Sequence, residues 1–83
     1  MFPKIKKIIA KEDFKLLVTF EDEATVLYDV LDDIRSIPAF EPLEKTPHLF
    51  KQFEVDESRT VVSWTNQIDL PSDTIREYGK VVL

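Results

Sequence analysis

The chain of 83 residues has no cysteine, one glycine and one histidine. The absence of cysteine excludes disulfides and thiolate metal sites, and one histidine is too few for a zinc site. No apolar run approaches the roughly 20 residues that a membrane helix needs. Lysines interrupt the first apolar stretch, so it does not read as a secretory signal. These absences predict a cytoplasmic protein without a metal or cofactor.

Charge is abundant and unevenly placed, with 16 acidic and 11 basic residues and a net charge of −5. The first 15 residues carry five lysines against two acids, or +3, whereas residues 16–44 carry eight acids against one arginine, or −7. An acidic chain does not suit general binding of nucleic acid backbones. We interpret the early lysines as the solvent face and edge protection of a strand, with a local basic patch as the alternative.

Residues 14–30 carry the strongest structural pattern, two alternating segments around the acidic turn at residues 21–23. Apolar side chains recur there with the period of two that is typical of a half-buried strand. Leu17 and Leu27 break the pattern, because both fall on the second face of the same predicted hairpin. That face is therefore partly apolar, and we expect it to be covered by a helix, a loop or another chain.

The remaining segments predict further strands and short helices. Residues 4–10 read as a first strand, residues 40–43 as an extended anchor, residues 53–64 as a second hairpin, and residues 65–70 as a polar turn. Helices are predicted over residues 29–36, where Asp29 would be the cap, over residues 48–52 after a Thr46-Pro47 start, and up to Tyr78 from a cap at Ser72 or Asp69. Gly79 suits a left-handed helix C-cap.

Together these elements predict one domain over residues 1–83 with an α+β fold. The fold would be an antiparallel sheet of two hairpins plus an N-terminal strand, four to six strands in all, with two or three short helices. The expected core comprises Phe14 or Leu16, Val18, Phe20, Val26, Tyr28, Phe50, Val55, Val62, Trp64 and Ile75.

The order of the motifs LLVTFEDE…LYDV, FEPL, HLF…FEVD and VVSWTNQIDLPSDTIRE resembles the domain-of-unknown-function family 2442 of small bacterial proteins. The resemblance runs from about Ile5 to Glu77 and implies an α+β module, alone or fused to a DNA-binding domain. It also implies that some relatives belong to toxin–antitoxin-like gene pairs, and it implies no catalytic residues. Glu23 and Gln67 stand where the family often has glycine, so we expect unusual turns there or left-handed backbone at Glu23 and Asn66.

Three groups of polar residues are candidate sites. Asp29, Asp32 and Asp33 could share a divalent ion, but a cap at Asp29 beside two solvated acids is the simpler interpretation. His48 lacks an orienting acid in the sequence, and we interpret it as a surface residue. Asn66 and Asp69 are candidates for a rim that binds an anion or small ligand, although turn chemistry explains both residues.

No pairing of a nucleophile or acid with a base is apparent, so the chain is not expected to be an enzyme, and no small-molecule substrate is identifiable. The leading hypothesis is a protein–protein interaction module that uses Leu17 and Leu27, with a homodimer or another protein as the partner. In a homodimer, the lysine-rich first strand could face the acidic turn of the second copy. A regulatory, antitoxin-like component is the alternative, and a small-ligand or anion-binding module is the weaker one. Membrane binding is not expected, nor is nucleic acid binding by this chain alone.

Overall fold

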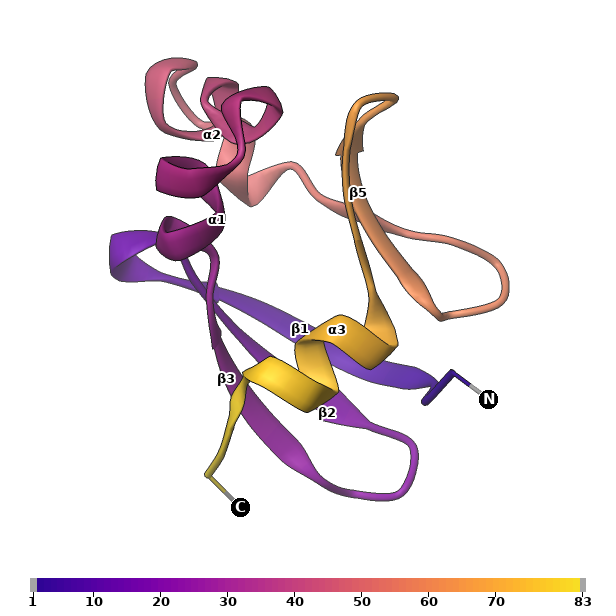
Figure 1. The fold of residues 1–83 in the computed structure, drawn as a ribbon. Helices are drawn as coiled ribbons and strands as arrows, with labels where there is room; N and C mark the ends of the chain where they lie inside the picture. The colour runs from indigo at the N-terminus through magenta and orange to yellow at the C-terminus, as the bar shows by residue number, and fades with distance from the viewer. Residues whose placement is uncertain (1, 83) are drawn as a thin grey trace.

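The computed structural model describes residues 2–82, which form two antiparallel sheets and three α-helices (Figure 1). The first sheet has the order β1-β2-β3-β7 and the second has the order β4-β5-β6. The strands are β1 (Ile5–Lys11), β2 (Lys15–Phe20), β3 (Thr25–Asp29), β4 (Glu54–Val55), β5 (Val61–Thr65), β6 (Ile68–Pro71) and β7 (Lys80–Val81). The α+β class is confirmed, although the strands divide between two sheets instead of forming one.

Short helical segments connect the strands. The α-helices are α1 (Val30–Ser36), α2 (Pro42–Lys45) and α3 (Ser72–Tyr78), and single 3-10 turns are η1 (Glu12–Phe14), η2 (Pro38–Phe40) and η3 (Leu49–Lys51). Within residues 2–82, no helix is long and apolar enough to cross a membrane.

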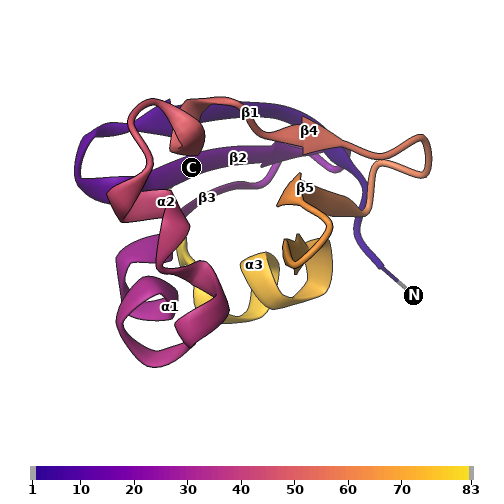
Figure 2. The same ribbon diagram turned by 90° about the horizontal axis from the view of Figure 1, so that it is seen from above.

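The period-two pattern of β2 and β3 sets the face that each side chain occupies. Leu16, Val18 and Phe20 of β2 are fully buried, and the intervening side chains of that strand are only half-buried. The helices α1 and α3 lie on the buried side of this sheet, and the sheet itself forms the opposite side of the molecule (Figure 2). We call the exposed side of the β1–β2–β3–β7 sheet the outer face.

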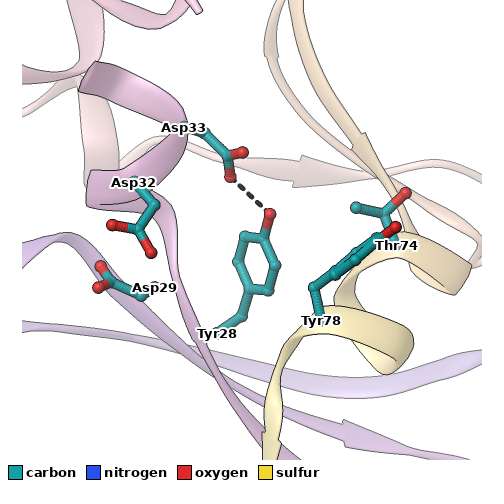
Figure 3. Close-up of a pocket in the computed structure, with 6 residues that line it drawn as sticks. All are labelled: Tyr28, Asp29, Asp32, Asp33, Thr74 and Tyr78. Carbon is teal, nitrogen blue, oxygen red and sulfur yellow. Dashed lines mark hydrogen bonds between the residues drawn. The ribbon is translucent and has the colours of Figure 1, made fainter. Parts of the chain in front are cut away.

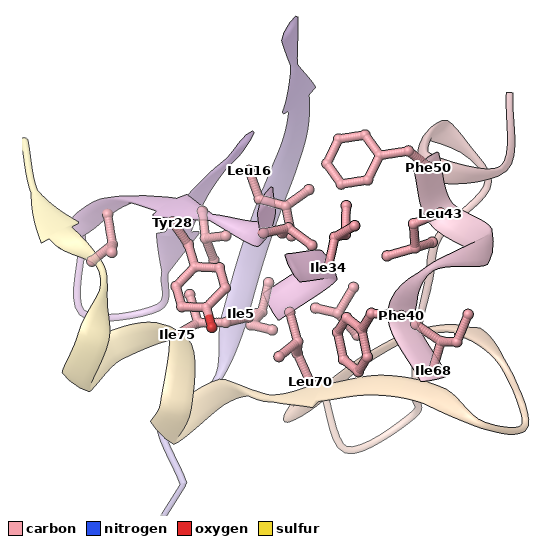
Figure 4. Packing of buried hydrophobic residues seen from close by; sticks show 14 of the residues in the cluster. Ile5, Leu16, Tyr28, Ile34, Phe40, Leu43, Phe50, Ile68, Leu70 and Ile75 are labelled. Atoms are coloured by element: carbon pink, nitrogen blue, oxygen red, sulfur yellow. The ribbon is translucent and has the colours of Figure 1, made fainter. Parts of the chain in front are cut away.

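The core lies between the first sheet, the helices and the second sheet (Figure 4). Of the predicted core, the structure confirms Leu16, Val18, Phe20, Val26, Tyr28, Phe50, Val62 and Ile75 as buried. Phe14, Val55 and Trp64 are only half-buried. Phe14 and Trp64 pack against the core from its side, and the Trp64 indole donates a hydrogen bond to the Phe50 carbonyl at 2.8 Å.

The prediction of a polar turn over residues 65–70 was wrong, because β6 begins at Ile68. Ile68 and Leu70 are both buried, while Asp69 between them faces solvent. Pro71 closes the strand without disturbing the ladder, because β6 is an edge strand and proline lacks only the N–H that an edge strand leaves unused.

The extended anchor predicted over residues 40–43 was also wrong. Pro38 and Pro42 each occupy the first turn of a helical segment, where proline's fixed φ is favourable, and they begin η2 and α2. The predicted helix over residues 48–52 is reduced to the 3-10 turn η3, and the Thr46 side chain does not cap it. Pro38 nevertheless lies just beyond the end of α1, as predicted.

Gly79 is needed for a close approach and not for a left-handed backbone. Its φ of −78° is ordinary, so the predicted left-handed cap was wrong. A Cβ built at Gly79 would collide with the Val26 side chain and lie 2.6 Å from the Ile75 carbonyl oxygen. Left-handed backbone was expected at Glu23 and Asn66. Glu23 has it, with φ 74°, whereas Asn66 does not.

The strand β1 is a sheet edge with two distinctive features. Its register with β2 shifts between Ile5 and Lys7, which places an irregularity at Lys6. Its beginning is joined to the β4–β5 turn, because the Ile5 amide donates to the Arg59 carbonyl at 2.8 Å. The two sheets therefore meet at the start of β1.

Candidate functional site

An acidic hollow of about 360 Å³ lies between the start of α1 and the end of α3 (Figure 3). It is lined by Tyr28, Asp29, Asp32, Asp33, Thr74 and Tyr78. The three aspartates come together because β3 runs directly into α1, so that the strand end and the first helical turn share one rim.

Asp29 has a structural role in this hollow. Its carboxylate accepts a hydrogen bond from the Leu31 amide at 3.0 Å, which confirms the predicted helix cap. Asp32 is exposed to solvent. Among residues 2–82, no group of three acidic or histidine side chains has the arrangement of a metal site.

Asp33 is bound to Tyr28, whose hydroxyl donates to its carboxylate at 2.6 Å. Burial raises the pKa of Asp33 above its ordinary value, and the charges of Asp32 and Asp29 add to that rise. The pKa of the Tyr28 phenol is also raised, first by burial and then by its bond to Asp33. The tyrosine is therefore held in its neutral form as a hydrogen-bond donor, and the pair locks β3 to α1.

Asn66 and Asp69, the candidate ligand-binding residues, both lie at exposed positions of the β5–β6 hairpin. Asn66 lies in the exposed β5–β6 turn, and Asp69 faces solvent on β6 opposite Ser63. Neither Asp69 nor Ser72 caps α3, because the residue before that helix is Pro71. The Ser72 amide donates to the Thr60 carbonyl at 2.7 Å, and the Thr74 amide donates to the Asp73 carboxylate at 2.8 Å. Asp73 does lie in the first turn of α3, as the sequence indicated.

His48 lies at the rim of a second hollow between η1 and η3 and is exposed. His48, Asp13 and Phe14 all line this hollow with left-handed backbone, at φ 68°, 61° and 60°. The Phe14 ring meets the Phe50 ring edge to face at 5.3 Å, which holds the strained backbone through aromatic packing. His48 is at the surface, as predicted, and shares this hollow with Glu12, Asp13 and Glu44.

The outer face carries a continuous apolar row across three strands. Leu17 of β2 is directly opposite Ile9 on one side and Leu27 on the other. Ile9 is 39% exposed, and the two leucines are half-buried. The alternation of apolar residues predicts Leu17 and Leu27 together on this face. It does not predict Ile9, whose place depends on the pairing register of β1.

Lysines surround this apolar row. Lys7 and Lys11 flank Ile9 on β1, Lys15 lies opposite Lys11, and Lys80 of β7 lies opposite Leu27. Asp29, opposite Lys15, is the one acid among the paired residues that face outward, and its carboxylate already caps α1. The outer face is therefore apolar at its centre and positive at its rim, although the chain as a whole is acidic.

The acidic β2–β3 turn forms its ion pairs within the same chain. Lys6 binds Glu23 at 2.9 Å, and Arg76 of α3 binds Asp22 with both guanidinium nitrogens, the shorter contact being 2.8 Å. The hydrogen bond from Arg76 lowers the pKa of Asp22. The hypothesis that this turn would face the first strand of a second copy therefore loses much of its basis, because two of the acids and one of the lysines are already paired.

The profile of the family described as protein of unknown function (DUF2442) matches residues 5–80. Because the match covers most of the chain, the chain belongs to this family. No curated protein and no solved structure matches it.

Proposed function

We propose that this member of the DUF2442 family is a non-enzymatic cytoplasmic module that binds another protein through its outer face. The observation that carries the proposal is the partly exposed apolar row of Ile9, Leu17 and Leu27, which lies opposite the core on a sheet that the helices cover on one side only. Burying an aliphatic side chain stabilises a complex by about 1.5–3 kcal/mol at most. A row of three with a polar rim has the anatomy of a small interface.

The hollows do not favour an enzyme over this proposal. The acidic hollow holds carboxylates and two tyrosines, and its best-defined contact, between Tyr28 and Asp33, joins β3 to α1. The second hollow is bordered by aromatic packing and by the exposed His48, and its acids and lysines lie at the surface. The hydrogen bond from the Tyr28 hydroxyl to Asp33 is explained by the packing of β3 against α1, so it supplies no argument for catalysis and supports the non-enzymatic proposal.

A pair of matched variants tests the outer face. Ile9 on the outer face and Ile37 at the end of α1 are both 39% exposed. Tagged wild type, Ile9→Glu and Ile37→Glu would be expressed in the source cells, and the co-purifying proteins identified by mass spectrometry. We expect a stoichiometric partner with wild type and Ile37→Glu but not with Ile9→Glu. Retention of the partner by Ile9→Glu would refute the role of this face.

The antitoxin-like role implied by the family resemblance stays a prediction. It requires that the product of an adjacent gene inhibits growth and that co-expression of this chain relieves the inhibition. The Ile9→Glu variant should then fail to relieve it, while Ile37→Glu should succeed. If the product of the adjacent gene does not inhibit growth on its own, the antitoxin-like role is rejected, and a protein-binding role without neutralisation is left.

A further inference from the structure

We infer that the partner of the outer face is a different protein whose binding surface has an apolar centre and an acidic rim. This inference rests on the proposed function and specifies the chemistry of the partner. Lys7, Lys11, Lys15 and Lys80 against Asp29 give the face a formal charge of +3, four minus one, in a chain whose net charge is −5.

A second copy does not fit this face. In a two-fold dimer the same patch lies on both sides of the interface, so the lysines of one copy would face the lysines of the other. Like charges placed against each other across an interface oppose association. Two acids of the β2–β3 turn, Glu23 and Asp22, are already paired with Lys6 and Arg76 of their own chain. The face is therefore complementary to a surface of opposite charge and not to itself.

A polyanion fits the face less well than a protein does. Nucleic acid grooves and single strands are bound mainly through arginines and stacking aromatic rings. The outward-facing side chains of β1, β2 and β3 in the paired register include neither type. They do include an apolar row, which a phosphate backbone would leave in water and an apolar protein surface would bury.

The chain itself supplies a defined probe of this chemistry. Lys7, Lys11 and Lys80 are exposed, so the triple variant Lys7→Glu/Lys11→Glu/Lys80→Glu keeps the apolar row and makes most of its rim acidic. Wild type mixed with this variant at high micromolar concentration should form a 1:1 complex in sedimentation velocity runs. Each protein alone should remain a monomer. Raising the salt from about 0.05 M to about 0.5 M should weaken the complex by about tenfold or more, because exposed charges are screened.

Two controls isolate the face. The triple variant Arg35→Glu/Lys45→Glu/Lys51→Glu changes the net charge by the same amount at exposed positions outside the first sheet, and it should not bind wild type. Adding Leu17→Glu to the acidic probe should abolish the complex. Circular dichroism would verify that each variant is folded. If the Lys7→Glu/Lys11→Glu/Lys80→Glu variant does not fold, the double variant Lys7→Glu/Lys11→Glu replaces it as the acidic probe.

Several outcomes would overturn the inference. If wild type dimerises alone and Leu17→Glu disperses the dimer, the occupant is a second copy, so the proposed function stands and the partner chemistry is wrong. The inferred acidic rim of the partner is also rejected if the control triple variant binds wild type as well as the acidic probe does, or if no mixture forms a complex. The Ile9→Glu experiment then still decides the proposed function independently. Binding of wild type to duplex DNA or to phosphatidylserine vesicles, lost in the acidic probe, would identify a polyanion surface instead.

Discussion

Arg59 binds both backbone groups of Ile5, which lies 54 residues earlier in the chain. The Ile5 amide donates to the Arg59 carbonyl at 2.8 Å, and the Arg59 Nε donates to the Ile5 carbonyl at 2.6 Å. A further guanidinium nitrogen donates to the Lys6 carbonyl at 3.1 Å. Arg59 thus takes the place of a neighbouring strand at the start of β1 and joins the second sheet to the first.

The side chain and the backbone of Arg59 are expected to contribute separately to stability. Arg59→Gly and Arg59→Ala both remove the guanidinium bonds, which should lower the free energy of unfolding by about 1–2 kcal/mol. Arg59 has φ 62°, a strain that alanine keeps and glycine relieves, so Arg59→Gly should lose about 1 kcal/mol less than Arg59→Ala. Urea unfolding measures both, and identical values for the two variants would contradict a strained backbone.

Gly79→Ala should destabilise the fold by about 1–3 kcal/mol, the range typical of an overpacked core. The added methyl group would meet the Val26 side chain and the Ile75 carbonyl, and β3 and α3 would have to separate to admit it. Tyr78→Ala is the control, because Tyr78 is 74% exposed and its loss should change stability by no more than about 0.5 kcal/mol. A melting temperature of Gly79→Ala equal to wild type would show that the contact is loose.

Asp29→Ala should lower the free energy of unfolding by about 1 kcal/mol, because it removes the acceptor that caps α1. Asp29→Asn keeps an acceptor at that position and should retain most of the stability. Thermal unfolding of the two variants at one pH separates the cap from the charge. Equal losses in both variants would indicate that the carboxylate charge, and not the cap geometry, is what α1 requires.

Asp33 should make stability fall as the pH rises. Its pKa is raised above its ordinary value of 3.8, so the folded chain holds the proton to higher pH than the unfolded chain does. The free energy of unfolding therefore decreases as the pH rises from 3.8 to the raised pKa of folded Asp33, and the decrease persists at neutral pH. Asp33→Asn removes this loss and keeps an acceptor for Tyr28, so the variant should gain stability relative to wild type at pH 7 but not at about pH 3.

Urea unfolding of wild type and Asp33→Asn at the two pH values checks this prediction. Asp22, whose pKa is lowered by Arg76, contributes the opposite pH dependence in both proteins and cancels in the comparison. A stability difference that is the same at both pH values would show that the folded and unfolded chains bind the Asp33 proton equally.

The first hairpin could be predicted from the sequence because one of its faces is buried. A shift of one residue would expose Leu16, Val18 and Phe20 together, so the alternation itself determines the register. The same alternation predicts Leu17 and Leu27 as neighbours across the hairpin, and the pairing of β2 with β3 confirms this. The cap at Asp29 was also predictable, because a cap involves only residues adjacent in sequence.

The second sheet and the site details depend on contacts that the sequence does not display. The strand β6 has only two buried apolar residues, Ile68 and Leu70, and it follows polar residues typical of a turn. The prediction of an extended anchor over residues 40–43 was wrong because proline can begin a helical segment as well as end one, and Pro38 and Pro42 begin η2 and α2. The ion pair between Asp22 and Arg76 spans 54 residues, a distance at which a single sequence gives no signal.

The irregularity at Lys6 has a consequence for how the molecule behaves at high concentration. A long, regular, apolar edge strand is a template on which further chains add to build fibrils. Here the register of β1 shifts near its beginning, lysines recur along the strand, and Arg59 occupies the backbone groups of Ile5. A strand arriving from another molecule would find a bent and charged edge that is partly occupied. The chain can therefore expose an apolar row to a partner without offering itself as a seed for cross-β assembly.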